Sequence, residues 1–341
     1  MIARDLDRLK NFLPASASSV QLDTGRKSLS RSSQVRGKMG HPFANSDSKK
    51  FRERVAEFVQ TGLHRTTATN ILFICGGSEP SHLRPRFIEY MRAELKDYIP
   101  FKPEIAQDDY FANDQGGRLN LSDFEELISD LALGIVLFAE SPGSYAELGL
   151  FSALENVRKK TLVILDANKQ GPGSFLSMGP AATISRHSRF GDPLQMPFDN
   201  PNFGQVRDSI YTKLTIPGSY RSIGAKDYSK LTTLEVFSLI WFYVDFLQVA
   251  SLDDIVFCMD SAFGAHTSNE QIRQVISVLV GANLLRRIEP LGLVRVVDNT
   301  PKLAESLKTK RRVLEDMNVE MLALIDACED EYYLEAFANV A

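Results

Sequence analysis

The sequence predicts an α/β protein, with a parallel sheet in its first half and a mainly helical domain after about residue 228. Three short runs are apolar throughout, at residues 71–74, 135–139 and 161–165, which is the pattern of strands covered on both faces. Helical patterns lie between these runs, and such alternation is typical of a parallel sheet. The 341 residues are enough for two domains, and 44% hydrophobic with 24% charged residues is ordinary for a globular protein.

The elements of the first half follow from apolar spacing and from turn residues. Helices are expected over residues 50–63, 86–98, 121–131, 145–158 and 205–213, and strands over 71–74, 102–106, 135–139 and 161–165. Residues 107–113, which include Tyr110, are expected to form a loop. The Gly- and Pro-rich residues 170–204 are expected to be a long connection that lines a pocket or contacts another subunit.

The second half has a different pattern. Helices are expected over residues 234–249, from residue 251 or 252 onward, and over 268–280, followed by a hairpin of 284–288 and 293–297. Three helices and a hairpin make a winged helix-turn-helix pattern. The predicted organisation is a basic leader (1–50), an α/β domain (51–220), a winged-helix-like domain (228–300) and C-terminal helices (301–341).

Charge is distributed unevenly along the chain. The net charge is −4, yet residues 1–50 carry 10 Lys or Arg and 4 Asp or Glu, so a basic arm precedes an acidic body. The arm is either a flexible leader or a segment that contacts nucleic acid. No run approaches the ~20 apolar residues of a membrane span, and no signal peptide is apparent. We expect a cytoplasmic protein that does not contact a membrane.

Metal binding is not expected. The three cysteines and five histidines are scattered, without the spacing of a metal site or a disulfide framework.

The most informative segment follows the strand over 135–139 and reads Ser141-Pro142-Gly143-Ser144-Tyr145-Ala146-Glu147-Leu148-Gly149. Ser144 and Glu147 have the spacing of a capping box, and capping alone is one interpretation of Glu147. The other interpretation is a ligand site, because residues after parallel strands line the crevice where open α/β sheets bind ligands. A second strand, 71–74, also leads into small residues, Gly76-Gly77-Ser78.

These residues resemble the nucleoside 2-deoxyribosyltransferase-like superfamily, in which a G-S/T-x-x-E-L-G pattern follows a strand. The resemblance covers about residues 68–215 and implies a Rossmann-like domain. It implies that Glu147 attacks, or stabilises, the anomeric carbon of a ribosyl or deoxyribosyl group. Asn120 and Asp123 are similar to the polar segment that holds sugar hydroxyls in relatives. This chain has Glu140 where the ordinary transferases usually have Asp.

The resemblance makes NAD or another nucleotide the expected substrate, with no bound cofactor. Breaking a C1′–N bond passes through an oxocarbenium-like state, which a nearby carboxylate stabilises. We expect Glu147, near a helix N-terminus, to be ionised at neutral pH. Serines are expected to hold phosphate, and Tyr110 or Tyr145 to stack on the base. The expected substrate-binding residues are Gly76, Gly77, Ser78, Tyr110, Asn120, Asp123, Ser141, Gly143, Ser144 and Tyr145.

The string from Ile71 to Phe151, followed by a helical domain, is similar also to retron-associated effector toxins. That resemblance implies a toxin restrained by the retron reverse transcriptase and multicopy single-stranded DNA/RNA, and leaves a homo-oligomer open. Two other functions compete with it. One is a winged-helix regulator that senses a nucleotide, and the other is a housekeeping nucleotide phosphoribohydrolase.

The winged-helix-like domain offers a few arginines for contact with nucleic acid or a protein partner. They are Arg273 on the third helix and Arg286 and Arg287 on the hairpin. Glu270 and Glu289 dilute their charge, so we expect this domain to dock a partner rather than read a DNA sequence.

Overall fold

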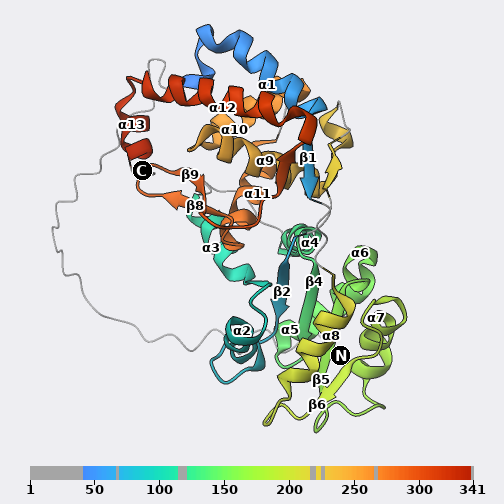
Figure 1. Cartoon of the computed structure of the whole chain (residues 1–341). Helices are drawn as coiled ribbons and strands as arrows, with labels where there is room; N and C mark the ends of the chain where they lie inside the picture. The colour runs from blue at the N-terminus through green and yellow to red at the C-terminus, as the bar shows by residue number, and fades with distance from the viewer. Residues whose placement is uncertain are drawn as a thin grey trace, which may run out of the picture. The chain divides into compact units, whose positions relative to one another are not determined.

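A five-stranded parallel sheet forms where the apolar runs predict it, and Figure 1 shows several of its strands side by side. The computed structural model describes residues 41–66, 69–113, 121–215, 220–223, 227–264 and 268–338, without the side chains of residues 113 and 121–124. All of these residues belong to one compact unit, Gly40–Ala341. The strand order is β3-β2-β4-β5-β6. The strands are β2 (Ile71–Cys75), β3 (Ile99–Phe101), β4 (Gly134–Phe138), β5 (Thr161–Asp166) and β6 (Leu194–Met196).

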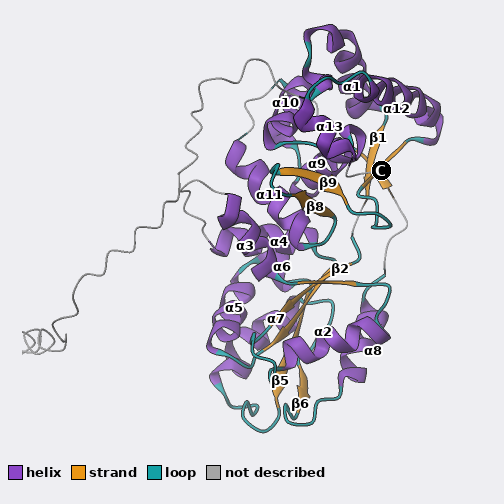
Figure 2. Ribbon diagram, turned by 90° about the vertical axis from the view of Figure 1, so that its left-hand side faces the viewer, coloured by secondary structure: helices purple, strands orange, loops and turns teal. Residues whose placement is uncertain are grey.

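Helices cover both faces of this sheet, which explains why its strands are apolar throughout. Side chains alternate along β2, so Leu72 and Ile74 pack on one face while Ile71 and Phe73 pack on the other. Figure 2 shows α2 and α8 on one side of the strands and α5 and α7 on the other. The bounds are α2 (Leu83–Glu94), α4 (Leu121–Leu131), α5 (Pro142–Ala153), α6 (Glu155–Arg158), α7 (Ala182–His187) and α8 (Phe203–Lys213).

The prediction of a strand over residues 102–106 is wrong, and so is the prediction of a loop over residues 107–113. The structure places strand β3 earlier, at Ile99–Phe101, and residues Pro103–Asn113 form helix α3. Two prolines explain the difference. Pro100 is tolerated because β3 is an edge strand, and Pro103 has the fixed φ that suits the first position of a helix.

The expected connection over 170–204 contains structure of its own. It holds a π-helical turn (Ser177–Ala181), helix α7 and the edge strand β6, which pairs with β5. Strand β6 has only three residues, too few to show a periodicity in the sequence.

The helical part contains the predicted three helices and hairpin. They are α9 (Thr233–Leu247), α10 (Leu252–Phe263), α11 (Asn269–Gly281), β8 (Leu285–Ile288) and β9 (Leu293–Val296). The two strands pair antiparallel, and Ala250 adds a bridge to Val294 of β9. The order of elements matches the expectation, and the winged-helix assignment stays a prediction. Helix α3 packs on α11 so closely that a Cβ on Gly281 would lie 2.7 Å from the Cβ of Ala106.

A second sheet joins three distant segments of the chain and was not expected. Its order is β10-β1-β7, formed by β1 (Leu63–Thr66), β7 (Tyr220–Ser222) and β10 (Ala304–Ser306), and both pairings are antiparallel. Helix α1 (Lys49–Thr61) precedes β1 and packs on α10, so these N-terminal elements lie with the helical part. The chain continues through α12 (Arg311–Asp326) and α13 (Glu331–Ala338). Within the described ranges no helix is long and apolar enough to cross a membrane.

Candidate active site

An open cleft of about 420 Å³ lies beyond the carboxyl ends of β2, β3 and β4. The residues after β2 and β4 form two of its walls, as the two glycine-containing loops predict. Helices α3, α4 and α5 each add a glutamate. The lining residues are Gly76, Gly77, Ser78, Glu79, His82, Arg84, Pro103, Glu104, Gln107, Glu125, Ser141, Pro142, Gly143 and Glu147.

Helix α5 begins three residues earlier than expected, and this changes the environment of Glu147. Ser141, not Ser144, is the N-cap, and the capping box pairs Ser141 with Ser144. The Ser141 hydroxyl accepts from the Ser144 N–H at 3.2 Å, while the Ser144 hydroxyl accepts from the Ser141 N–H at 2.9 Å. The predicted capping box of Ser144 with Glu147 is therefore wrong. Glu147 lies in the second turn, where its carboxylate is not needed for capping.

The Glu147 side chain lines the cleft but is largely withdrawn from solvent. Its Oε2 atom is buried and has no hydrogen-bond partner among the residues that the structure describes. Burial raises the pKa of Glu147 from 4.5 to about 7, and the nearby Glu125 carboxylate adds to the rise. The expectation that Glu147 is ionised at neutral pH is therefore corrected, because with this pKa the group is protonated in part of the molecules. The N-terminal dipole acts mainly within the first turn, and here desolvation outweighs it.

Glu125 on α4 is a second carboxyl group in the same cleft, and the sequence analysis did not single it out. Burial raises its pKa to about 7 as well. Each of the two carboxyl groups, Glu125 and Glu147, is therefore protonated in part of the molecules near neutral pH.

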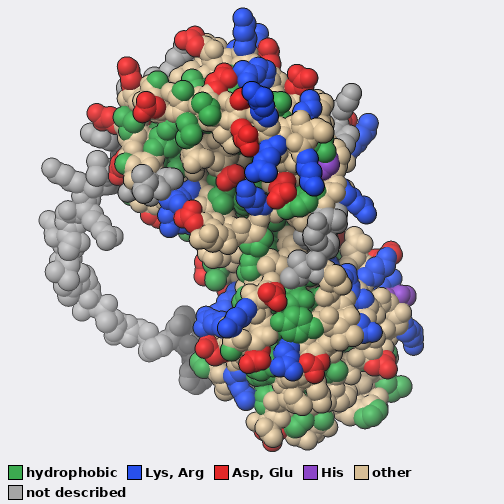
Figure 3. All heavy atoms as spheres, viewed as in Figure 1, with side chains coloured by type: hydrophobic (Ala, Val, Ile, Leu, Met, Phe, Trp, Pro, Cys, Tyr) green, Lys and Arg blue, Asp and Glu red, His purple; other side chains and the backbone are tan. Residues whose placement is uncertain are grey.

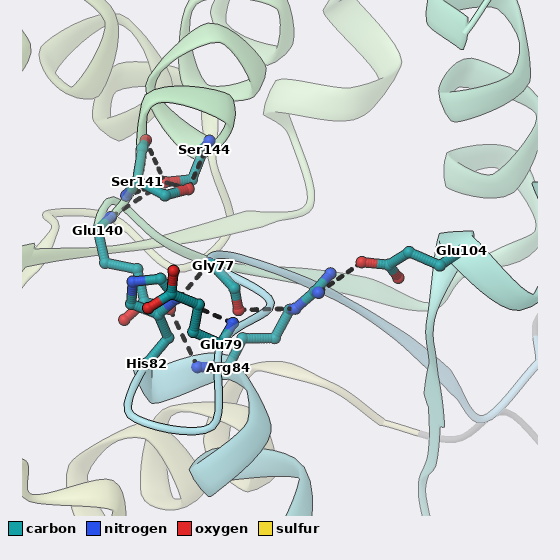
Figure 4. Close-up of polar contacts among 8 residues, drawn as sticks. All are labelled: Gly77, Glu79, His82, Arg84, Glu104, Glu140, Ser141 and Ser144. Carbon is teal, nitrogen blue, oxygen red and sulfur yellow. Dashed lines mark hydrogen bonds and ion pairs between the residues drawn. The ribbon is translucent and has the colours of Figure 1, made fainter. Parts of the chain in front are cut away.

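Glu140, at the end of β4, joins the two loops of the cleft. Its carboxylate accepts three backbone N–H groups, from Gly77 at 3.0 Å, Leu83 at 2.6 Å and Arg84 at 3.1 Å. Figure 4 shows the contacts with Gly77 and Arg84. Leu83 and Arg84 begin α2, so the carboxylate satisfies this helix N-terminus. Gly76 has φ +151°, and a Cβ there would lie 2.7 Å from Glu140 Oε1. The glycine is required by this close approach.

Arg84 spans the cleft from α2 to α3. Its Nε donates to the Gly77 carbonyl at 3.1 Å, and its Nη2 donates to Glu104 Oε1 at 2.5 Å (Figure 4). The Arg84 side chain is 9% exposed, whereas that of Glu104 is 46% exposed. Arg84 is thus a positioned cation inside a cleft whose other charged groups are mainly carboxylates. His82 lies beside it, and its Nδ1 accepts from the Glu79 N–H at 3.1 Å.

The structure brings five of the predicted substrate-binding residues to the cleft: Gly76, Gly77, Ser78, Ser141 and Gly143. The predicted stacking role of Tyr110 is wrong, because α3 buries its side chain completely in the core. Tyr145 is half-buried, and its hydroxyl accepts from Gln170 at 3.2 Å. Ser144 is buried and serves the cap. Asn120 lies outside the described residues, as does the side chain of Asp123.

The sequence analysis missed several lining groups for an identifiable reason. Glu104 and Gln107 were assigned to a strand and a loop, but the helix that starts at Pro103 turns both toward the cleft. Glu125 lies two residues beyond Asp123, within the helix that the sequence did predict. His82 and Arg84, at the start of α2, also line the cleft.

The predicted contact arginines of the helical part differ in their surroundings. Arg287 is bound within the chain by Asp109 of α3, at 2.9 Å from Nε to Oδ1 and 2.8 Å from Nη2 to Oδ2. Arg286 is exposed and Arg273 is half-buried. Contact of either with a partner stays a prediction. Across the described ranges, no group of three or more His, Cys, Asp or Glu side chains could hold a metal ion.

Comparison with known proteins gives a consistent assignment. A family model described as STM3845 retron effector protein matches residues 80–287, more than half of the chain. The Escherichia coli protein named "Retron Ec86 putative ribosyltransferase/DNA-binding protein" is 32% identical over 146 residues, which cover 41% of this chain and 47% of that protein. The retron Ec73 protein of the same description, also from Escherichia coli, is 30% identical over 122 residues, covering 35% and 39%.

Each alignment thus spans less than half the length of the curated relative. The family match covers the cleft residues from His82 to Glu147 and helices α9 to α11, and it includes Arg286 and Arg287. The chain belongs to the STM3845 retron effector protein family.

Proposed function

We propose that this retron effector is a toxin of an anti-phage defence system that breaks the N-glycosidic bond of NAD or another nucleotide. The observation that carries the proposal is the position of Glu147. Its carboxyl group lies in the cleft beyond the parallel strands, free of the capping box, with one buried oxygen that lacks a partner among the described residues. An unsatisfied buried carboxylate costs stability and marks a functional site. The ribosyltransferase wording in the names of both curated relatives agrees with this chemistry.

In the proposed reaction the C1′–N bond breaks and its electron pair leaves with the base. The sugar then carries oxocarbenium-like positive charge, which the ionised Glu147 carboxylate stabilises or captures as a covalent ester. Water, or another acceptor, adds at C1′ and displaces the Glu147 carboxylate where an ester has formed, and a proton is released when water is the acceptor. Hydrolysis and transfer share every step before the acceptor arrives.

Glu125 is the proposed source of a proton for leaving groups that need one. Nicotinamide departs from NAD as a neutral base without protonation, whereas adenine departs more easily when a ring nitrogen accepts a proton. Glu125 has a pKa of about 7, so a useful fraction is protonated at neutral pH. Arg84, the cation positioned in this cleft, is placed to meet a phosphate oxygen of the substrate.

The family membership also supports a proposal about how the activity of the toxin is restrained. A free active site of this kind would deplete a shared nucleotide pool, so the active protein must be restrained by binding. We infer that the retron reverse transcriptase and its RNA–DNA product supply that restraint. The helical part is the proposed docking region, since a minimal transferase core does not need it.

The test is incubation of the purified chain with a panel of nucleotides that includes NAD, with released base separated by chromatography. Wild type should release base from at least one substrate, and Glu147→Gln should release it at least about a hundredfold more slowly. The isosteric change keeps size and most hydrogen bonding, and an unchanged melting temperature would show that the fold is intact.

The outcomes separate the competing functions. Activity of Glu147→Gln within a few-fold of wild type would remove the proposed role of Glu147. Binding of a nucleotide without any turnover, equal in wild type and variant, would favour the nucleotide-sensing regulator. Turnover confined to free nucleoside monophosphates, with no effect on retron function, would favour the housekeeping phosphoribohydrolase.

A further inference from the structure

Helix α2 begins at the cleft, and none of the N–H groups of its first turn, which the structure describes in full, is free. Leu83 and Arg84 donate their N–H groups to the Glu140 carboxylate, at 2.6 Å and 3.1 Å. The N–H of the N-cap, His82, donates to a carbonyl three residues earlier at 2.9 Å, and Pro85 has no N–H. The first N–H groups of a helix are those that lack a partner within it. At α2 the protein itself supplies an acceptor for each of them.

Helix α5, which begins after β4, is closed in a similar way. The N–H groups of Ser141 and Ser144 are bound within the capping box, and Pro142 has no N–H. The remaining residue of this turn, Gly143, lines the cleft. Doubly wound sheets commonly bind a phosphate at such helix ends, through several N–H groups at once. Here the two helix ends, as far as the structure describes them, offer the N–H of Gly143 alone.

The Glu140 carboxylate occupies the place that a substrate phosphate takes in folds of this kind. It binds N–H groups from the loop after β2, at Gly77, and from the start of α2, which are the donors that would surround a phosphate. It also carries the charge that the dipole of α2 favours. A second anion at this place would meet a carboxylate where it needs N–H groups. The chain thus supplies its own anion to this helix end.

The side chains of the cleft add little capacity for anions. Arg84 is the one lysine or arginine among the lining residues that the structure describes, and Glu104 pairs with it at 2.5 Å. Three more glutamates line the same cleft: Glu79, Glu125 and Glu147. Each phosphate group that enters would approach these carboxylates. It would also disfavour the ionised form of Glu147, which the proposed reaction needs.

The surface around α2 does not compensate for the charge of the cleft. Figure 3 shows Lys and Arg side chains lying among Asp and Glu side chains over the region where Figure 1 draws α2 and α8. On the described part of this face there is no large area of positive charge. Since a surface of mixed charge attracts polyanions weakly, multiply charged nucleotides gain little from it.

We propose that Glu140 makes the cleft selective for N-ribosyl compounds that lack a terminal phosphate, namely nucleosides, or dinucleotides whose phosphates are esterified on both sides. This inference rests on the proposed function of the cleft. A diester phosphate carries a single charge, which Arg84 can meet, whereas a terminal phosphate carries about 1.5 to 2 charges at neutral pH. The chain excludes the more highly charged compounds by placing its own carboxylate where their phosphates would bind. The same feature separates this cleft from that of a phosphoribohydrolase, whose nucleoside monophosphate substrates end in a terminal phosphate.

Chemical rescue tests the place of the Glu140 carboxylate without any turnover. Glu140→Ala empties that place, so its melting temperature should fall, and sodium formate or inorganic phosphate should then raise it by about 2 °C. Glu79→Ala, which removes an exposed acid of the same cleft, is the matched control. Wild type and Glu79→Ala should respond to the two anions no more than they respond to sodium chloride at equal ionic strength.

Selectivity is measured as kcat/KM for base release from adenosine, NAD, AMP and ATP. Wild type should favour adenosine or NAD over AMP and ATP by at least about tenfold, and Glu140→Ala should narrow that ratio by about tenfold. Comparison of adenosine with NAD shows which of the two permitted classes the cleft takes. Glu140→Gln keeps the shape of the side chain and removes its charge. It should narrow the ratio by a smaller factor, and it serves where Glu140→Ala does not fold.

The outcomes separate this inference from the proposed function. If wild type releases base from none of the four compounds, the proposed function fails, and thermal shifts with the same compounds then decide the selectivity. Turnover of ATP as fast as that of adenosine and NAD, or a ratio unchanged in both Glu140 variants, would overturn the selectivity and leave the proposed function intact. Equal rescue of Glu79→Ala, or no rescue of a folded Glu140→Ala, would overturn the assigned place of the carboxylate.

Discussion

Asp109 of helix α3 holds Arg287 of strand β8 through two nearly equal hydrogen bonds, of 2.9 and 2.8 Å. The Ser277 hydroxyl of α11 donates to the same carboxylate at 2.6 Å. The side chains are largely buried, at 8% exposure for Asp109 and 14% for Arg287. The same helix α3 carries Glu104 and Gln107 into the cleft. One short helix therefore connects the helical part with the candidate active site.

Because of this ion pair, we expect substitution of Arg287 to destabilise the protein more than substitution of its neighbour Arg286. Arg287→Gln removes the cation that pairs with the buried Asp109 carboxylate at 2.8 Å, so the free energy of unfolding should fall by about 3 kcal/mol. Arg286→Gln, one residue away and exposed, should change it by less than about 0.5 kcal/mol. Thermal and denaturant unfolding measure both. Equal stability of the two variants would show that the pair contributes little.

Stability should depend on pH through the two carboxyl groups of the cleft. The folded protein raises the pKa of Glu147 and of Glu125 from 4.5 to about 7, so between these values it holds protons that the unfolded chain releases. The stability that protonation provides is full below pH 4.5 and is lost as the pH rises toward 7. Glu147→Gln should flatten this dependence of melting temperature on pH, and an unchanged profile would contradict the raised pKa.

Glu125→Gln should affect substrates according to their leaving groups. Release of adenine, which benefits from protonation, should slow by about a hundredfold or more, whereas release of nicotinamide from NAD should slow much less. The pH profile of kcat/KM should lose its alkaline limb in this variant and keep the acid limb set by Glu147. Uniform slowing of all substrates would assign Glu125 to binding instead of proton transfer.

Glu140 is expected to matter for the architecture of the cleft. Glu140→Gln puts an amide NH₂ where a carboxylate oxygen accepts N–H groups from Gly77 or the start of α2, and should cost about 2 kcal/mol of stability. Glu79→Gln, which changes an exposed acid of the same cleft, is the control and should leave unfolding unaltered. Urea denaturation of the two variants shows whether stability depends on the hydrogen bonds of Glu140 or only on the loss of one negative charge in the cleft.

Toxicity should depend on context. Expression of the chain alone should harm cells and deplete nucleotide pools, co-expression of the retron partners should relieve the harm, and Glu147→Gln should be harmless in both settings. Growth curves and extracted nucleotides give the readout. A harmless wild type with unchanged pools, both alone and with the partners after a phage-type trigger, would refute the toxin proposal.

The parts of the fold that could be predicted are those with a strong local pattern. Strands β2, β4 and β5 are continuous apolar runs of five or six residues, and Glu147 lies in the segment that follows β4. The N-terminal boundary of α5 at Ser141 was harder to predict from the sequence, because two serines three residues apart both suit an N-cap. Only the packed structure selects Ser141, by turning the Ser144 hydroxyl back onto the cap.

The rest depends on contacts between distant segments. Strands β1, β7 and β10 have three or four residues each and stabilise one another across the chain, so none has a periodicity of its own. Glu125 becomes part of the site only because α4 packs beside the cleft. The raised pKa values also arise from burial, which a list of residues does not reveal.

The close approach of α3 and α11 at Ala106 and Gly281 has a consequence for the cleft. A methyl group added at Gly281 would not fit against Ala106, so at this point the two backbones are in direct contact, with no side chain between them. Glu104, the residue that holds Arg84, lies on the same helix two residues before Ala106. The tightest contact between α3 and α11 therefore lies close to the group that positions the cation of the cleft.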